Sequence, residues 1–242
     1  MLYLRPDRKQ PQSKDWPALF AQQAATARHP LLQTYYRAGV VKPDTPLAEV
    51  PLLALDIETT GLNPRQDAIV SIGLVPFTLT RIRVSHSRYW VVRPQRPLKT
   101  RSIVVHGITH SEIASSPDLA AVLPDLLRAL AGQVVVVHCR QIERQFFALA
   151  LQRLWQEGIV FPVIDTMELE AQHVRTGIRD RIAHLFGRNR RSIRLAASRA
   201  RYQLPAYRPH HALTDALATA ELLQAQIAHR YDPQRPVAEF WR

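Results

Sequence analysis

The sequence predicts an α/β domain in which a mixed sheet is flanked by helices. Three strand-like runs come first, rich in β-branched and aromatic residues and separated by turn-type residues. Strand and helix patterns then alternate, and a long amphipathic helix ends the series. Because 242 residues with 46% hydrophobic content can bury a sizeable core, we expect one main domain with a small appendage.

The first 50 residues predict the appendage, a small helical extension followed by a linker. Residues 16–39 are typical of two short helices that are divided by Pro30 and end at Gly39. Residues 41–51 contain three prolines, which resist regular structure, and we interpret them as the linker. We expect the extension to pack on a main domain of residues 51–232, with a tail at 233–242.

Within the main domain, strands are expected over residues 51–59, 68–77 and 82–92, and their order indicates an antiparallel meander. Residues 116–132 predict a helical region that Pro124 splits or kinks. A strand at 133–138, a helix at 142–158 and a strand at 160–165 follow. Apolar residues at helical spacing then predict the last helix, over 211–231.

The charge balance indicates a polyanionic partner, because the formal net charge is +12 and the isoelectric point is near 10.6. Nucleic acid is the obvious candidate, although charge alone does not separate a nuclease from a passive binder. Cys139 is the only cysteine, which excludes an intramolecular disulfide and a thiolate zinc cluster and fits a reducing, cytoplasmic setting. The polar N-terminus and the lack of a long apolar stretch predict a soluble protein without a membrane partner.

Two carboxylates end the first apolar strand, in the run Leu-Asp-Ile-Glu-Thr-Thr-Gly-Leu at residues 55–62. Asp56 and Glu58 project from the same face of the strand and repel each other unless a cation lies between them. Such oxygen ligands suit Mg²⁺ or Mn²⁺, and two ions roughly 3.5–4 Å apart can clamp a phosphodiester displacement. The alternative is a solvated strand end, which the poor strand propensity of Asp and Glu makes the weaker interpretation.

A second motif begins the last helix, where His210 and His211 precede Asp215. His210 would lie on the loop entering the helix and Asp215 in an early turn, so that both could face one site. A neutral histidine can take a proton from metal-bound water, since its ordinary pKa lies near neutrality. Alternatively, Asp215 complements the helix N-terminus and the histidines are ordinary surface residues.

Together the two motifs resemble the DnaQ-like family of 3′→5′ exonucleases, in the subgroup with a DEDDh signature, over residues 50–230 approximately. The form Asp-x-Glu-Thr-Thr-Gly is matched by Asp56, Glu58, Thr59, Thr60 and Gly61. The form His-x-Ala-x-x-Asp is matched by His210, Ala212 and Asp215, and residues 105–109 look like the family's connection after the third strand. The resemblance implies a ribonuclease H-like fold, with a mixed five-stranded sheet.

The family's middle motif is where this sequence departs from the pattern. His138 matches, but Cys139 replaces an asparagine and Glu143 occupies the position of an aspartate. We expect Glu143 to be the third acidic ligand, because no other carboxylate lies between Asp125 and Glu157. The alternative is that Glu143 is only a first-turn residue favoured by the helix dipole.

The resemblance also implies roles for these residues. Asp56, Glu58 and Asp215 would bind the metal ion that activates water, and Glu143 would support a second ion. His210 would be the general base, and the product would be a nucleoside 5′-monophosphate. Weaker candidates for seating the terminal nucleotide are Thr60, Gly61, Leu62 and His106.

The implied substrate is the single-stranded 3′ end of a nucleic acid, with DNA favoured, and proofreading would require a separate polymerase subunit. Two alternatives stay open: an exoribonuclease that trims RNA 3′ ends, and a catalytically weak binding or polymerase-accessory module. Seven arginines between residues 175 and 194 favour phosphate contacts, or else a solvated loop. They are Arg175, Arg179, Arg181, Arg188, Arg190, Arg191 and Arg194. Asp165, ahead of a helical segment, is interpreted as a cap and not as a fifth ligand.

Overall fold

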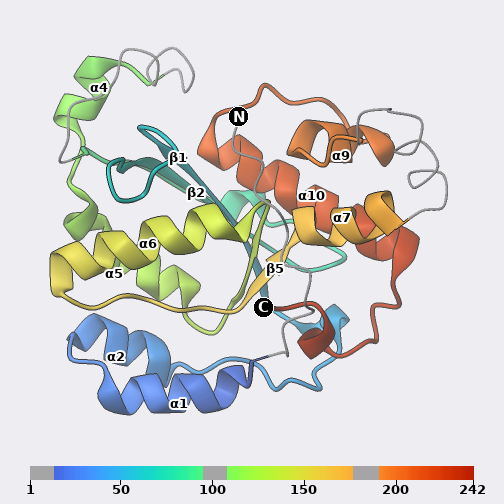
Figure 1. Cartoon of the computed structure of the whole chain (residues 1–242), viewed down its shortest axis with the longest axis horizontal. Coiled ribbons are helices and arrows are strands. Elements are labelled where there is room, and N and C mark those ends of the chain that lie inside the picture. The colour runs from blue at the N-terminus through green and yellow to red at the C-terminus, as the bar shows by residue number, and fades with distance from the viewer. Residues whose placement is uncertain (1–13, 95–107, 177–190) are drawn as a thin grey trace.

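A computed structural model describes residues 14–94, 108–176 and 191–242 of the chain (Figure 1). Its five strands form one mixed sheet in the order β3-β2-β1-β4-β5. The central strand β1 (Leu52–Thr59) pairs antiparallel with β2 (Ile69–Phe77) and parallel with β4 (Val134–Val137). The edge strands are β3 (Arg88–Val91) and β5 (Val163–Asp165). The predicted mixed sheet with an antiparallel meander is therefore confirmed.

The helices of the described residues flank this sheet and join its strands (Figure 1). Their bounds are α1 (Trp16–Thr26), α2 (Pro30–Arg37), α4 (His110–Ser115), α5 (Leu119–Leu130), α6 (Arg140–Trp155), α7 (Thr166–Thr176), α9 (Leu195–Arg201) and α10 (Ala212–Arg230). Short 3₁₀ turns occupy Leu47–Glu49, Val84–His86 and Val237–Glu239. The two N-terminal helices, divided at Pro30, match the prediction for residues 16–39.

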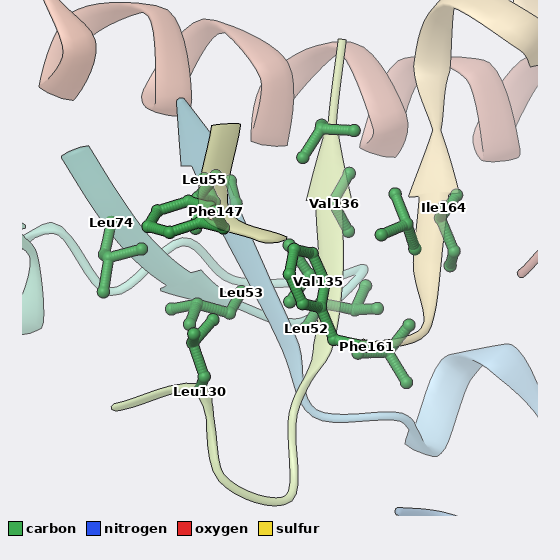
Figure 2. Close-up of a cluster of buried hydrophobic side chains, with 14 of the residues drawn as sticks. Leu52, Leu53, Leu55, Leu74, Leu130, Val135, Val136, Phe147, Phe161 and Ile164 are labelled. Carbon is green, nitrogen blue, oxygen red and sulfur yellow. The ribbon is translucent and has the colours of Figure 1, made fainter. Parts of the chain in front are cut away.

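The core lies on both faces of the sheet. Successive residues Leu52 to Leu55 of β1 are all buried, although their side chains alternate between the faces. Figure 2 shows Phe147 of α6 in the same apolar cluster as Leu55 of β1 and Leu74 of β2. On the other face, α10 packs against β1, β2 and β4. Helices thus cover both faces of the sheet, as its apolar central strands require.

The N-terminal helices and the C-terminal segment share this core. Trp16, Phe20 and Tyr36 are buried in the same cluster as the sheet, and the Tyr36 hydroxyl accepts a hydrogen bond from the Val160 amide at 3.0 Å. Residues 43–48 form backbone hydrogen bonds with residues 233–238. Arg242 extends the pairing of β5, because its amide donates to the Val163 carbonyl at 2.9 Å.

Three boundaries differ from the sequence prediction. Residues 84–86 form a 3₁₀ turn, so the third strand is shorter than predicted and its pairing with β2 begins only at Arg88. The helix α5 continues through Pro124 without a break, since burial of its leucine face offsets the missing N–H donor. The helix α6 begins at Arg140, two residues early, because the Asp165 carboxylate accepts hydrogen bonds from the Cys139 and Arg140 amides.

Candidate active site

Two carboxylates on the central strand form the base of the candidate site. Asp56 is half-buried and Glu58 is buried, in the second half of β1, where the strand still pairs with β2 but no longer with β4. Burial raises the pKa of Asp56 well above its usual range, and the charges of Glu58, Glu143 and Asp215 raise it further. Four acidic side chains from β1, α6 and α10 are therefore close enough to act on one another electrostatically.

The start of α10 completes the site. One ligand atom each from Glu58, His210 and Asp215 lie within 4.8 Å of one another, the spacing of a group that can hold a metal ion. His210 is exposed and has a left-handed backbone with φ of 69°, and its amide donates to Asp215 Oδ2 at 2.8 Å. Burial raises the pKa of Asp215, and Glu58 adds to the shift, although the His210 amide lowers it.

The neighbouring histidine has a different environment. His211 is the N-cap of α10, where its Nδ1 accepts a hydrogen bond from the Thr214 amide at 3.4 Å. Its ring stacks on Tyr89 of β3, with the ring centroids 4.7 Å apart and the planes 20° apart. The structure therefore brings His210, and not His211, into the group with Glu58 and Asp215.

Glu143 lies in the first turn of α6 and is buried, with 3% of its surface exposed. Its Oε2 has no hydrogen-bond partner among the described residues, although buried carboxylate oxygens are nearly always paired. Burial raises the pKa of Glu143 well above its usual range, and the charge of Asp165 adds to the shift, against the lowering effect of its own amide. Carboxylate oxygens are among the ligands that hard cations prefer.

The structure confirms that Asp165 caps a helix, and it shows a second role for this residue that the sequence did not indicate. Its carboxylate accepts from the Met167 and Glu168 amides at the start of α7, at 2.9 and 3.3 Å. It also accepts from the Cys139 and Arg140 amides at the start of α6, at 3.2 and 3.0 Å. One carboxylate thus caps the helix that carries Glu143. No local pattern could reveal this, because Asp165 and Arg140 at the start of α6 are 25 residues apart.

The turn after β1 contains three of the residues expected to seat a nucleotide. Thr60 is buried, and its hydroxyl accepts from the Ala68 amide at 3.0 Å and donates to Asp67 at 3.3 Å. A Cβ on Gly61 would lie 2.5 Å from the Asp67 carboxylate, so a side chain at this position would require the Asp67 side chain to shift. Leu62 is 76% exposed, and His106 lies outside the described residues.

The arginine-rich segment is described only in part. Arg191 and Arg194 are exposed, as a phosphate-contacting surface requires. Residues 177–190, which include four of the seven arginines, lie outside the described residues. No helix in residues 14–94, 108–176 or 191–242 is both long and apolar enough to span a bilayer.

Comparison with known proteins gives a family match over most of the chain. The model of the RNase T family, described as "Exonuclease", matches residues 53–223. DNA polymerase III subunit epsilon of Treponema pallidum is 27% identical over 180 residues, which cover 74% of this chain and 78% of that protein. A PolC-type DNA polymerase III of Thermotoga petrophila is also 27% identical, over 179 residues. That match covers 74% of this chain but only 12% of the polymerase.

Solved structures share the fold. Exonuclease X in complex with 5′ overhanging duplex DNA has a TM-score of 0.56 at 24% identity, covering 76% of this chain and 96% of that one. The nuclease domain of 3′hExo, a DEDDh family member bound to rAMP, has a TM-score of 0.60 at 16% identity. It covers 74% of this chain and 92% of that one. The fold is therefore the ribonuclease H-like arrangement that the sequence predicted.

Proposed function

The chain belongs to the RNase T exonuclease family, and from this premise we propose that it is a divalent-metal-dependent 3′→5′ exonuclease acting on nucleic acid. The observation that carries the proposal is the convergence of Glu58, His210 and Asp215 within 4.8 Å, beside Asp56. This arrangement combines a cluster of acidic oxygens with a base at the mouth of the site.

The residues present fit divalent cations. Asp56, Glu143 and Asp215 each have a raised pKa, caused first by burial, so the site carries an electrostatic cost that a cation would relieve. We assign Asp56, Glu58, Glu143 and Asp215 as the ligands, a set of hard oxygens that suits Mg²⁺ or Mn²⁺. Two bound ions would stabilise negative charge on the scissile phosphate and lower the pKa of the attacking water.

His210 is assigned as the general base. In its neutral form it takes a proton from the attacking water as the new oxygen–phosphorus bond forms. The bond between phosphorus and the 3′ oxygen of the penultimate nucleotide breaks, and the released nucleotide carries the 5′ phosphate. The hydrogen bond from the His210 amide to Asp215 orients His210 relative to the acidic cluster.

The turn after β1 is the proposed seat of the terminal nucleotide. The exposed Leu62 side chain offers an apolar contact that any base can make, and Thr60 and Gly61 shape the turn beneath it. His106 is retained as a candidate from the sequence. The polymerase III relatives and the exonuclease X complex support DNA as the first substrate to test, and the polymerase III relatives support a polymerase subunit as a partner.

The test is digestion of 5′-labelled single-stranded DNA and RNA in Mg²⁺, Mn²⁺ or EDTA. We expect a ladder that shortens from the 3′ end only with metal, and an at least about 100-fold lower rate for Asp215→Asn. Asp118→Asn is the matched control, since among the described residues the Asp118 side chain bonds the Ala121 amide as the cap of α5. Comparing the rates on DNA and on RNA identifies the preferred substrate. Binding of either strand without hydrolysis in any metal would overturn the proposal and leave a nucleic-acid-binding module.

A further inference from the structure

The segment that leads to His210 is exposed over residues 205–209 and is held by a cluster behind it. Arg199, in α9, is only 3% exposed and lies between α10 and this segment. Its guanidinium donates to the Pro205 carbonyl at 2.9 Å and to the Ala218 carbonyl of α10 at 2.6 Å. One buried cation therefore ties the loop to the helix that carries Asp215.

Two further side chains complete the cluster. Glu221 of α10 accepts from Arg199 at 2.7 Å through Oε2 and from the Tyr207 hydroxyl at 2.8 Å through Oε1. The Arg199 guanidinium also lies 4.6 Å from the centre of the Tyr207 ring, a cation–π contact. We call Arg199, Tyr207 and Glu221 the Arg199 cluster. Tyr207 is its only member within the loop.

The spacing from this cluster to the general base is short. Only Arg208 and Pro209 separate Tyr207 from His210, so the two Cα atoms are at most about 11 Å apart. Pro209 has a fixed φ and limits the conformations of the residue before it. His210 itself has φ of 69°, which is costly for a residue with a side chain and persists only where the surroundings impose it. Asp215 accepts a hydrogen bond from the His210 amide, and the Arg199 cluster holds the chain three residues before His210.

We propose that Arg199, Tyr207 and Glu221 are positioning residues that hold His210 in the conformation needed for proton abstraction. This inference rests on the proposed function. None of the three side chains belongs to the acidic cluster or to its candidate metal group. Loss of the Arg199 cluster should therefore slow the chemical step, while metal affinity and the apparent affinity for the nucleic acid are kept.

The rival interpretation is that the cluster only joins α9 to α10 and contributes stability. The choice of variant separates the two. Arg199→Ala would leave the Glu221 charge without its buried partner and risks misfolding, whereas Tyr207 is partly exposed and can be removed more safely. Tyr202→Phe is the matched control, because the Tyr202 hydroxyl joins α7, α9 and α10 through Glu170 and Arg230, at 3.1 and 2.7 Å.

The experiment is a double-mutant cycle in the full chain, with Tyr207→Ala and His210→Ala alone and together. We expect Tyr207→Ala to lower kcat by about 10-fold or more, since small misplacements of catalytic groups cost that much, and to change KM by less than about 2-fold. In the His210→Ala background, Tyr207→Ala should have no further effect. Tyr207→Phe keeps the ring over Arg199, so its kcat should lie between those of the wild type and Tyr207→Ala. If Tyr207→Ala lowered kcat by the same factor in the His210→Ala background as in the wild type, the proposal would be overturned.

Hydrogen exchange gives a measurement that does not depend on activity. The backbone amides of residues 203–211, other than Pro205 and Pro209, should exchange faster in Tyr207→Ala than in the wild type, and at the wild-type rate in Tyr202→Phe. Unchanged exchange in Tyr207→Ala would overturn the proposal even if kcat fell. If the wild-type chain hydrolyses no substrate, the proposed function is overturned. Faster exchange in Tyr207→Ala would in that case still support the hold of the cluster on His210.

Discussion

The backbone of Ala212 at the start of α10 lies directly against Gly73 of β2. A Cβ placed on Gly73 would be 2.3 Å from the carbonyl carbon and oxygen of Ala212. Because those atoms belong to the backbone, the whole start of α10 must move to admit any side chain. Gly73 pairs with Asp56 across the β1–β2 ladder, so such a movement would carry Asp215 away from Asp56.

Gly73→Ala should therefore damage activity far more than stability. Overpacking of this kind costs about 1–3 kcal/mol in free energy of unfolding, whereas the displacement of Asp215 should lower kcat at least about 100-fold. Urea unfolding and initial rates on labelled DNA measure the two effects. Gly158→Ala is the control, because its Cβ would meet atoms at an ordinary 3.5 Å. Wild-type rates for Gly73→Ala would contradict the argument.

The acidic cluster should make the metal-free protein less stable as pH rises. Burial raises the pKa values of Asp56, Glu143 and Asp215 in the folded state, so the folded chain binds more protons than the unfolded chain above about pH 4. The stability that these protonated groups contribute is fully present below that pH and is lost as pH rises through their raised pKa values. Asp56→Asn should therefore be about 1–2 kcal/mol more stable than the wild type at neutral pH in EDTA.

Thermal unfolding in EDTA at pH 7 and at pH 4 checks this sign. The advantage of Asp56→Asn should shrink at the lower pH, where the wild-type carboxyl groups are protonated. Mg²⁺ should raise the Tm of the wild type more than that of the variant, because a ligand that binds only the folded state stabilises it by mass action. An advantage for the variant that does not depend on pH would contradict the electrostatic explanation.

Glu143→Gln tests whether the buried carboxylate is a ligand. The change keeps the size of the side chain but removes its charge, so we expect a rate lower by about 10- to 100-fold and a higher metal concentration for half-maximal rate. Titration of Mn²⁺ at saturating DNA measures both quantities. Glu49→Gln, at an exposed site remote from the cluster, is the control. An unchanged metal requirement would mean that Glu143 serves only the helix.

Asp165→Ala should cost more stability than the loss of an ordinary cap. Removing one N-cap side chain costs about 1 kcal/mol, and Asp165 caps both α6 and α7. We expect about 2–3 kcal/mol in chemical unfolding, against about 1 kcal/mol for Asp118→Ala, which caps α5 alone. Equal losses for the two variants would show that the capping of α6 contributes little.

Local patterns in the sequence were sufficient to predict the strands and the long helices. The apolar run before Asp56 and the helical spacing after His211 are short-range signals, and they predicted β1 and α10 closely. The third strand was predicted too long, because its β-branched residues are equally compatible with the exposed turn at 84–86. The path through Pro124 depends on tertiary burial, which overrides local propensity.

The candidate site was predictable only where a short motif carries it. The spacing of Asp56 and Glu58, and of His210 and Asp215, is visible in the chain, and the structure brings these residues together. The contribution of Gly73 was not predictable, because a glycine inside a strand does not reveal which distant backbone approaches it. The Arg199 cluster was equally hidden, since its members come from two helices and a loop that meet only in the folded chain.

The extension of β5 by the backbone of Arg242 also matters for handling the protein. The C-terminal segment covers an edge of the sheet with its backbone, and Trp241 is fully buried beside it. A fragment cut at residues 51 and 232 would present that edge, and the apolar surface beneath Trp16 and Trp241, to solvent. Uncovered strand edges beside apolar surface promote aggregation. Segments far from the carboxylates would then decide whether a shortened nuclease stays in solution.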